Sequence, residues 1–116
     1  FGGNAGAESQ FMISKIKYNL GDYESAESNI FTLVSDFSAY DEWKFKGFLL
    51  LVRTYIGLND LFQARATAES IMENVNVEWV QNACSDLMME IEAMEGSELN
   101  GTDLIETGTQ NEVNDK

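Results

Sequence analysis

Apolar residues recur every three or four positions along most of this chain, and this spacing predicts a succession of amphipathic helices. The clearest stretch carries apolar residues on one face and acidic or polar residues on the other. Its apolar positions are Tyr23, Ala26, Ile30, Leu33, Val34 and Phe37. The complete set of predicted helices covers about residues 7–20, 23–37, 41–58, 61–75 and 77–95. The predicted fold class is therefore all-α, with five helices.

Two short stretches carry the signals of a tight turn between helices. Gly21 and Asp22 separate the first two predicted helices, and Asn59 and Asp60 separate the third and fourth. Gly or Asn can adopt the left-handed conformation that ends a helix, and Asp can then cap the free N–H groups of the next helix. Each stretch is therefore predicted to be the turn of a helical hairpin.

The second turn repeats the first. Ala26 and Ala64 occupy equivalent positions after the two turns. The interval between them is slightly longer than the roughly 34-residue unit of helical-hairpin repeats. The small side chain of Ala26 allows the partner helix to approach closely. We therefore expect two stacked hairpins, residues 7–37 and 41–75.

The predicted fifth helix, residues 77–95, has a polar outer face, as expected of a helix that caps a stack. The helical domain is expected to span residues 7–96. A flexible Gly-rich segment, residues 1–6, precedes it, and a disordered acidic tail, residues 97–116, follows it.

Finer details of the helices also follow from the pattern. Ile13, Ile16 and Leu20 recur at helical spacing and mark the apolar face of the first helix. Asp41 and Asn76 are the expected N-caps of the third and fifth helices. Apolar residues surround most of the third helix, which is expected to be the buried centre of the domain.

Composition and charge exclude several kinds of function. The net charge of −13 repels phosphate backbones, so nucleic acid is not expected as a partner. The longest apolar run, residues 48–52, is far shorter than the roughly 20 residues of a membrane-spanning helix. The chain has no histidine and a single cysteine, Cys84, which is expected to be an inert core thiol. No metal, cofactor or catalytic residue is expected, and the protein is predicted not to be an enzyme.

The run Gly21-Asp22-Tyr23-Glu24-Ser25-Ala26 resembles the turn of the tetratricopeptide repeat (TPR) family, and a degenerate copy stands at residues 59–64. The stretches 40–43 and 62–67 are similar to the C-terminal repeats of long bacterial cell-envelope proteins of that family. The resemblance implies a right-handed α-α superhelix with a concave groove that binds a protein or peptide. It also implies a location in the bacterial cell envelope or periplasm. The chain begins at Phe1 without an initiator Met, so a fragment of a longer protein is expected.

Carried onto this sequence, the resemblance implies groove-lining residues on the first and third helices. These residues are Phe11, Lys15, Tyr18, Asn19, Lys46, Leu49 and Arg53. The three cations among them can clamp carboxylates of a partner through charge-assisted hydrogen bonds. Alternatively, they are ordinary solvated charges or members of surface ion pairs.

The expected function is a non-enzymatic protein-interaction module that presents this groove. The alternative is a structural element that joins the repeats of a longer protein or self-associates, without a separate ligand. Two hairpins and a cap are fewer than the three or more repeats usually needed for a stable stack. The outer face of the first helix is therefore a predicted raw edge, through which a homodimer can form.

Overall fold

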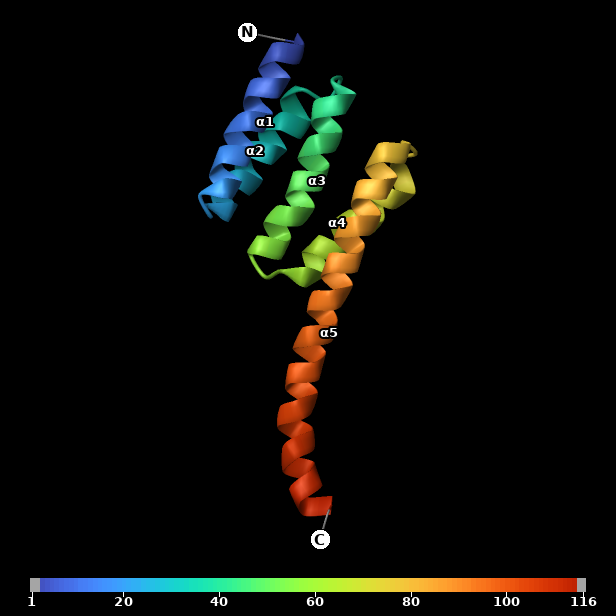
Figure 1. The fold of residues 1–116 in the computed structure, drawn as a ribbon. Coiled ribbons are helices and arrows are strands. Elements are labelled where there is room, and N and C mark those ends of the chain that lie inside the picture. Colours follow the sequence, from blue (N-terminus) through green and yellow to red (C-terminus); the bar gives the residue numbers. More distant parts are fainter. Residues whose placement is uncertain (1–2, 115–116) are drawn as a thin grey trace.

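The computed structural model describes the backbone of residues 3–114 and the side chains of residues 3–98. Its elements are α1 (Gly3–Asn19), α2 (Tyr23–Asp36), α3 (Asp41–Gly57), α4 (Leu61–Asn74) and α5 (Glu78–Asn114). The described part of the chain contains no strand. The predicted all-α fold, two helical hairpins followed by a fifth helix, is confirmed (Figure 1).

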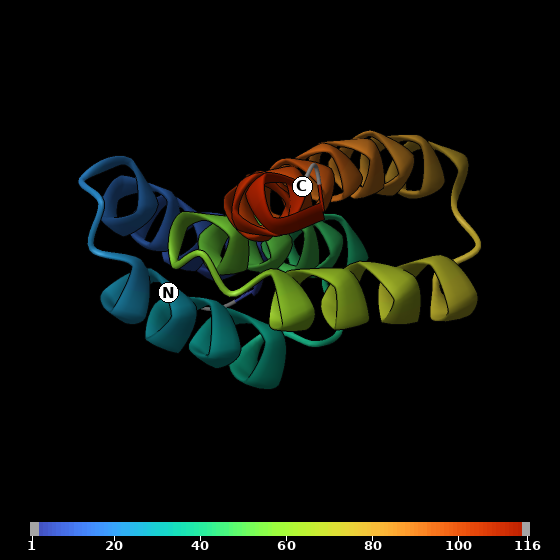
Figure 2. The same cartoon turned by 90° about the horizontal axis from the view of Figure 1, so that it is seen from below.

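The helices form two layers. Figure 2 shows α1, α3 and α5 side by side in one layer, with α2 and α4 in the other. Helix α3 contacts all four other helices, whereas α1 contacts α2 and α3, and α5 contacts α3 and α4. The predicted central position of the third helix is confirmed.

Both hairpin turns have the predicted chemistry. Gly21 and Asn59 adopt left-handed backbone conformations, with φ of 79° and 59°. The carboxylates of Asp22 and Asp60 each accept a hydrogen bond from the backbone N–H three residues later, at 3.3 and 3.1 Å. These local signals end one helix and start the next.

The two other predicted caps are wrong. Asp41 is already the first residue of α3, and Tyr40 precedes it without a side-chain cap. Asp41 therefore lies in the first turn, where its negative charge interacts favourably with the helix dipole and stabilises the helix. Helix α5 begins at Glu78, and the carbonyl of Val77 accepts its first hydrogen bond. Val77, rather than Asn76, thus occupies the N-cap position.

The two hairpins have the same helix lengths and the same loop length. Helices α1 and α3 both have 17 residues, and α2 and α4 both have 14. The loops that join α1 to α2 and α3 to α4 also have equal length, so the two hairpins align without a gap. Gly3, the first residue of α1, is therefore equivalent to Asp41 of α3 and to Glu78 of α5. Equivalent positions further along the three helices are counted from these first residues.

The apolar core lies between the two layers and extends from α2 to α5. The predicted apolar face of α2 is buried or half-buried, and apolar residues at helical spacing on α4 and α5 are buried as well. Their buried residues include Ala26, Ile30, Leu33, Ala64, Ala68, Ile71, Val80, Cys84, Leu87 and Ile91. The periodicity of these three helices therefore predicted which side packs inward.

Helix α1 is the exception, because its predicted apolar face is turned outward. Ile13, Ile16 and Leu20 are exposed, whereas the buried residues of α1 are the small Gly6, Ala7 and Ser14. Small side chains allow α1 to pack closely on α2 and α3, and Ser14 satisfies its hydroxyl by donating to the Gln10 carbonyl. The larger apolar residues are left on the side where the described chain has no further helix.

The N-terminal boundary also differs from the prediction. Helix α1 begins at Gly3, so residues 3–6 of the segment predicted to be flexible are helical, while residues 1 and 2 lie outside the described residues. The first turn is held by tertiary contacts: Gly6 is buried, and the indole Nε1 of Trp43 donates to Asn4 Oδ1 at 3.0 Å.

The helical region also extends further at its C-terminal end than the sequence predicted. Helix α5 continues past residue 95 to Asn114, where the sequence predicted a disordered tail over residues 97–116 (Figure 1). The segment contains no proline, and a glycine such as Gly96 costs a helix only about 1 kcal/mol relative to alanine. Residues 115 and 116 lie outside the described residues. Among the helices described, none combines the length and apolarity needed to cross a membrane.

Candidate functional site

A cleft opens between α1 and α3 on the layer of odd-numbered helices. It has a volume of about 140 Å³. Its lining residues are Phe11, Lys15, Lys46, Leu49, Leu50 and Arg53. Phe11 and Lys15 are four residues apart on α1, as Leu49 and Arg53 are on α3, so each pair lies on one face of its helix. The two pairs also occupy equivalent positions in the repeat.

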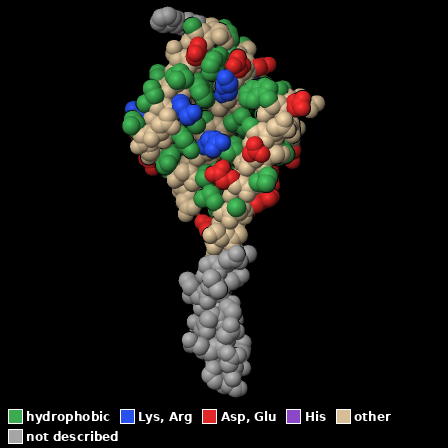
Figure 3. Space-filling model, in the orientation of Figure 1, with side chains coloured by type: hydrophobic (Ala, Val, Ile, Leu, Met, Phe, Trp, Pro, Cys, Tyr) green, Lys and Arg blue, Asp and Glu red, His purple; other side chains and the backbone are tan. Residues whose placement is uncertain are grey.

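The cleft gathers positive charge on an acidic protein. Three of the seven basic residues line it, although the net charge of the chain is −13. Figure 3 shows basic side chains gathered on the face formed by α1 and α3, with acidic side chains around them. Within residues 3–98, no carboxylate lies within ion-pair distance of Lys15 or Arg53, so their charges are open to a ligand.

Lys46 is placed differently from the other two cations. Its Nζ lies 2.9 Å from the Glu42 carboxylate and 4.4 Å from the centre of the Trp43 ring. The Trp43 ring in turn contacts Phe11 of α1, with ring centres 5.7 Å apart. Lys46 is therefore held in place by an ion pair and a cation–π contact, each worth about 1 kcal/mol or less at an exposed site.

A second hollow adjoins the cleft and shares Lys46 with it. It has a volume of about 550 Å³, and the start of α5 forms one of its walls. Its lining residues are Asp41, Glu42, Phe45, Lys46, Val77 and Trp79. We call the cleft and this hollow together the α3 groove. Its floor is apolar and aromatic, and its charge changes from basic beside α1 to acidic at the start of α3.

Helix α5 continues this change of charge. The positions of α5 equivalent to Phe11 and Lys15 are occupied by Asp86 and Glu90, and both side chains are exposed. The same repeat positions therefore carry cations on α1 and α3 and anions on α5. A ligand lying across the three helices meets a basic region at one end and an acidic region at the other.

Two residues of the predicted groove lie outside it. Tyr18 is half-buried, and its ring meets that of Tyr23 edge-on, with ring centres 5.6 Å apart. Asn19 is exposed as the last residue of α1. The structure thus brings together five of the seven predicted residues and turns Tyr18 towards the hairpin turn.

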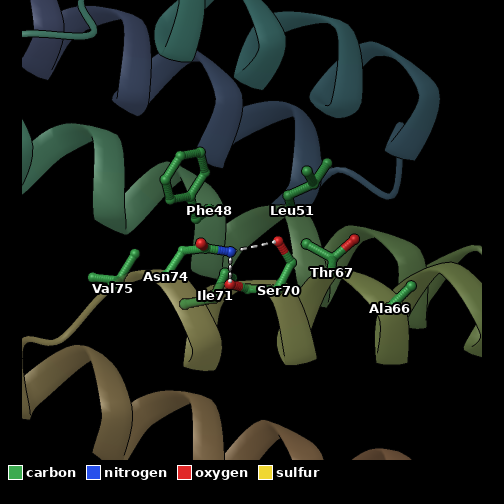
Figure 4. Close-up of a pocket in the computed structure, with 8 residues that line it drawn as sticks. All are labelled: Phe48, Leu51, Ala66, Thr67, Ser70, Ile71, Asn74 and Val75. Atoms are coloured by element: carbon green, nitrogen blue, oxygen red, sulfur yellow. Dashed lines mark hydrogen bonds between the residues drawn. The ribbon is translucent and has the colours of Figure 1, made fainter.

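A separate apolar pocket lies beside α4, and Phe48 and Leu51 of α3 form part of its lining (Figure 4). Its volume is about 380 Å³. Its polar groups include Ser70 and Asn74, which are hydrogen-bonded to each other through Asn74 Nδ2. None of the described residues that line this pocket is charged, so it offers no partner to an ionic ligand.

The described side chains hold no metal-binding cluster. No group of three His, Cys, Asp or Glu residues in this part of the chain could hold a metal ion. Burial raises the pKa of the Cys84 thiol, and its Sγ donates to the Ala68 carbonyl at 3.2 Å. This thiol is a packed core group, as predicted.

A cluster of ion pairs around Arg65 joins α4 to α5. Arg65 Nε donates to the Glu95 carboxylate at 3.0 Å, and Glu69 and Glu92 lie within ion-pair distance of the same guanidinium. The hydrogen bond from Arg65 lowers the pKa of Glu95 below its ordinary value of 4.5. Arg65 therefore stabilises the packing of α5 against α4.

Sequence reasoning missed part of the groove. Glu42, Phe45, Val77 and Trp79 line it, although their spacing along the chain gives no sign that they meet. The equivalence of Lys15 with Arg53 in the two hairpins was the available signal for a repeated basic position.

Comparisons of this chain with protein-family models, with curated proteins and with solved structures give no match.

Proposed function

We propose that this protein is a non-enzymatic interaction module that binds a segment of another protein in the α3 groove. The observation that carries the proposal is the convergence of Lys15, Lys46 and Arg53 around an apolar cleft on a chain of net charge −13. Among residues 3–98, Lys15 and Arg53 have no carboxylate within ion-pair distance, so an anionic group of a ligand can pair with them.

The groove favours a particular kind of ligand. Lys15 and Arg53 offer charge-assisted hydrogen bonds to carboxylates, and the apolar floor formed by Phe11, Leu49 and Leu50 suits an aliphatic or aromatic side chain. A ligand that extends over α5 meets Asp86 and Glu90. The ligand is thus a peptide segment that is acidic at one end, apolar in the middle and basic at the other end.

The repeated hairpins also support the proposal that this is a TPR-like stack. Its odd-numbered helices form one layer and carry the groove, as the resemblance of the Gly21–Ala26 turn to the TPR family implies. A bacterial cell-envelope protein remains the source that this resemblance favours. The second candidate function is a structural element of a repeat stack, and the exposed apolar residues of α1 favour it.

The test is a peptide array of short segments that combine acidic, apolar and basic residues in different orders. The best-binding peptide is then titrated in fluorescence-anisotropy experiments against the wild type and the double variant Lys15→Ala/Arg53→Ala. We expect the double variant to bind about tenfold more weakly or worse, since hydrogen bonds to charged groups contribute about 1.5–3 kcal/mol each.

The matched control is Lys17→Ala/Lys44→Ala, which removes one cation from α1 and one from α3 outside the cleft. It should bind the peptide within about twofold of the wild type, because long-range charge alone is screened at physiological salt. Equal weakening in both double variants would show that net charge, rather than the groove, controls binding. Unchanged binding in Lys15→Ala/Arg53→Ala would refute the proposal.

A further inference from the structure

On α3 and α5, one equivalent face points towards the preceding hairpin, and the same repeat positions are present on α1. On α3 and α5 this face is buried, because α1 and α2 pack against α3, and α3 and α4 pack against α5. The buried residues of this face are Gly47, Leu50 and Thr54 on α3, and Cys84, Leu87 and Ile91 on α5. The equivalent residues of α1 are Ser9, Met12 and Ile16.

The contacts made by this face are themselves equivalent. A Cβ added to Gly47 would lie 2.7 Å from Leu33 and 3.8 Å from Ile30, both on α2. Cys84 Sγ donates to the carbonyl of Ala68 on α4. Ile30 and Ala68 occupy the same repeat position on α2 and α4, so both helices meet the second helix of the preceding hairpin at the same point.

On α1 the same face is exposed and uncharged. Met12 is 47% exposed and Ile16 is 52% exposed, with Ile13 and Leu20 exposed beside them. At about 100° per residue, these four residues share one side of the helix with Ala5 and Ser9, and no charged residue lies among them. We call this surface the outer face of α1.

The other end of the stack is different. The outward side chains of α5 include Asn82, Ser85, Asp86 and Glu92, all exposed. A second copy stacked head to tail would place these polar and acidic groups against the outer face of α1. The charge pattern therefore disfavours a head-to-tail chain of copies.

A symmetric dimer through α1 is also disfavoured, on grounds of area. A helix of 17 residues is about 25 Å long and about 10 Å wide, so a pair of such faces buries roughly 500 Å². Stable interfaces between proteins bury about 1,200 Å² or more. The face is better suited to a pair of helices, which is what covers its equivalents on α3 and α5.

We propose that the outer face of α1 binds a helical hairpin of the α3–α4 kind, stacked as α3 and α4 stack on α5. The outer face of α1 and the buried face of α5 correspond position by position. Val80, Cys84, Leu87 and Ile91 of α5 correspond to Ala5, Ser9, Met12 and Ile16 of α1. Ile16 matches Ile91, and Met12 replaces Leu87 at nearly equal volume, an exchange that is well tolerated where helices pack. Ser9 replaces Cys84 with a hydroxyl that can donate to a backbone carbonyl as the thiol does, and Ala5 is smaller than Val80. This inference deepens the structural candidate function and does not depend on the α3 groove.

The test supplies that hairpin within one chain. A copy of residues 41–77, which contain α3, α4 and the following linker, is joined directly to Gly3 of the complete sequence, so that α1 takes the place of α5. We expect a single unfolding transition at a higher urea midpoint than that of the original chain. We also expect amide exchange in α1 to slow about tenfold or more, because burial of each Met or Ile side chain has an effect of that order.

The diagnostic variant is Met12→Asp/Ile16→Asp. In the original chain both positions are about half exposed, so the urea midpoint should change little; in the extended chain the gain in midpoint should disappear. The matched control Asn82→Asp/Ser85→Asp places two charges on exposed positions of α5 and should retain the gain. Lys15→Ala/Arg53→Ala should also retain it, which separates this inference from peptide binding.

Two results would overturn the proposal. The first is an extended chain that unfolds in two separate transitions or with the original midpoint. The second comes from light scattering of the original chain over a concentration series. A dimer that Met12→Asp/Ile16→Asp dissociates would show that a second copy, rather than a hairpin, covers the outer face of α1.

Discussion

Tyr55 of α3 links the two hairpins through a hydrogen bond to α2. Its ring is buried on α3, and its hydroxyl donates to Glu27 Oε2 of α2 at 2.7 Å. The pKa of Tyr55 is raised to about 12. Burial is the largest cause, and the hydrogen bond to Glu27 and the negative charge of Glu27 add to it. The neutral hydroxyl is therefore the form that the folded state favours.

We expect Tyr55→Phe to lower the free energy of unfolding by about 1.5–3 kcal/mol at neutral pH, since a hydrogen bond to a charged group is lost. Because the pKa is raised, the stabilisation by the Tyr55 hydroxyl is fully present below pH 10.0, the ordinary pKa of tyrosine. This stabilisation is lost as the pH rises towards about 12, where the hydroxyl ionises in the folded state. Urea unfolding of wild type and variant at about pH 7 and about pH 11 measures it. An equal difference between the two proteins at both pH values would contradict this account.

Gly57 allows the last turn of α3 to pack closely against Tyr23 in the first turn of α2. A Cβ added to Gly57 would lie 2.5 Å from the ring of Tyr23, closer than such atoms approach in real structures. The Tyr23 ring cannot easily yield, because Tyr18 of α1 packs against it. Three helices thus meet at this point, and the contact requires a residue without a side chain at position 57.

Gly57→Ala should destabilise the fold by about 1–3 kcal/mol through overpacking, although alanine favours helix by about 1 kcal/mol. In a Tyr23→Ala background the same substitution should be neutral or stabilising, and a double-mutant cycle of urea unfolding measures the coupling.

Gly96→Ala is the control for that cycle, because nothing lies within 4 Å of a Cβ at this position of α5. It should stabilise, or leave stability unchanged, in either background. If the changes in unfolding free energy caused by Gly57→Ala and Tyr23→Ala were additive, the two residues would not be in steric conflict.

The described contacts of α5 with the other helices come from its N-terminal half. Its buried side chains are Val80, Cys84, Leu87 and Ile91, and Glu95 adds the ion pair to Arg65. Beyond them the helix extends away from the two layers (Figure 1). Most of the apolar area that holds the helix in place is thus contributed before residue 92.

A chain that ends at residue 98 should therefore unfold in one transition, with the urea midpoint of the full chain. Circular dichroism should show a loss of helical signal that corresponds to the removed residues alone. A clear fall in midpoint would mean that residues 99–116 contribute to the stability of the stack.

Sequence patterns predicted the fold well and the groove in part. The caps Asp22 and Asp60, and the inward faces of α2, α4 and α5, follow from neighbours within one or two helical turns. Five of the seven groove residues that the TPR resemblance implied line the cleft. Phe11 and Lys15 share one face of α1, and Leu49 and Arg53 one face of α3, because the members of each pair are four residues apart. Phe45 and Trp79 could not be predicted, since the angle at which α5 returns to α3 brings them together.

The sequence by itself determined where the two hairpin turns lie, since the capping carboxylates and left-handed Gly21 and Asn59 act on the adjacent backbone. It did not determine which face of α1 is buried. Ile13 and Ile16 are more apolar than Ala7 and Ser14, yet the small residues pack inward. Close approach of neighbouring helices needs small side chains, and that requirement exists only once α1, α2 and α3 are assembled. Assembly also brought Lys15 and Arg53 together and left the outer face of α1 uncovered.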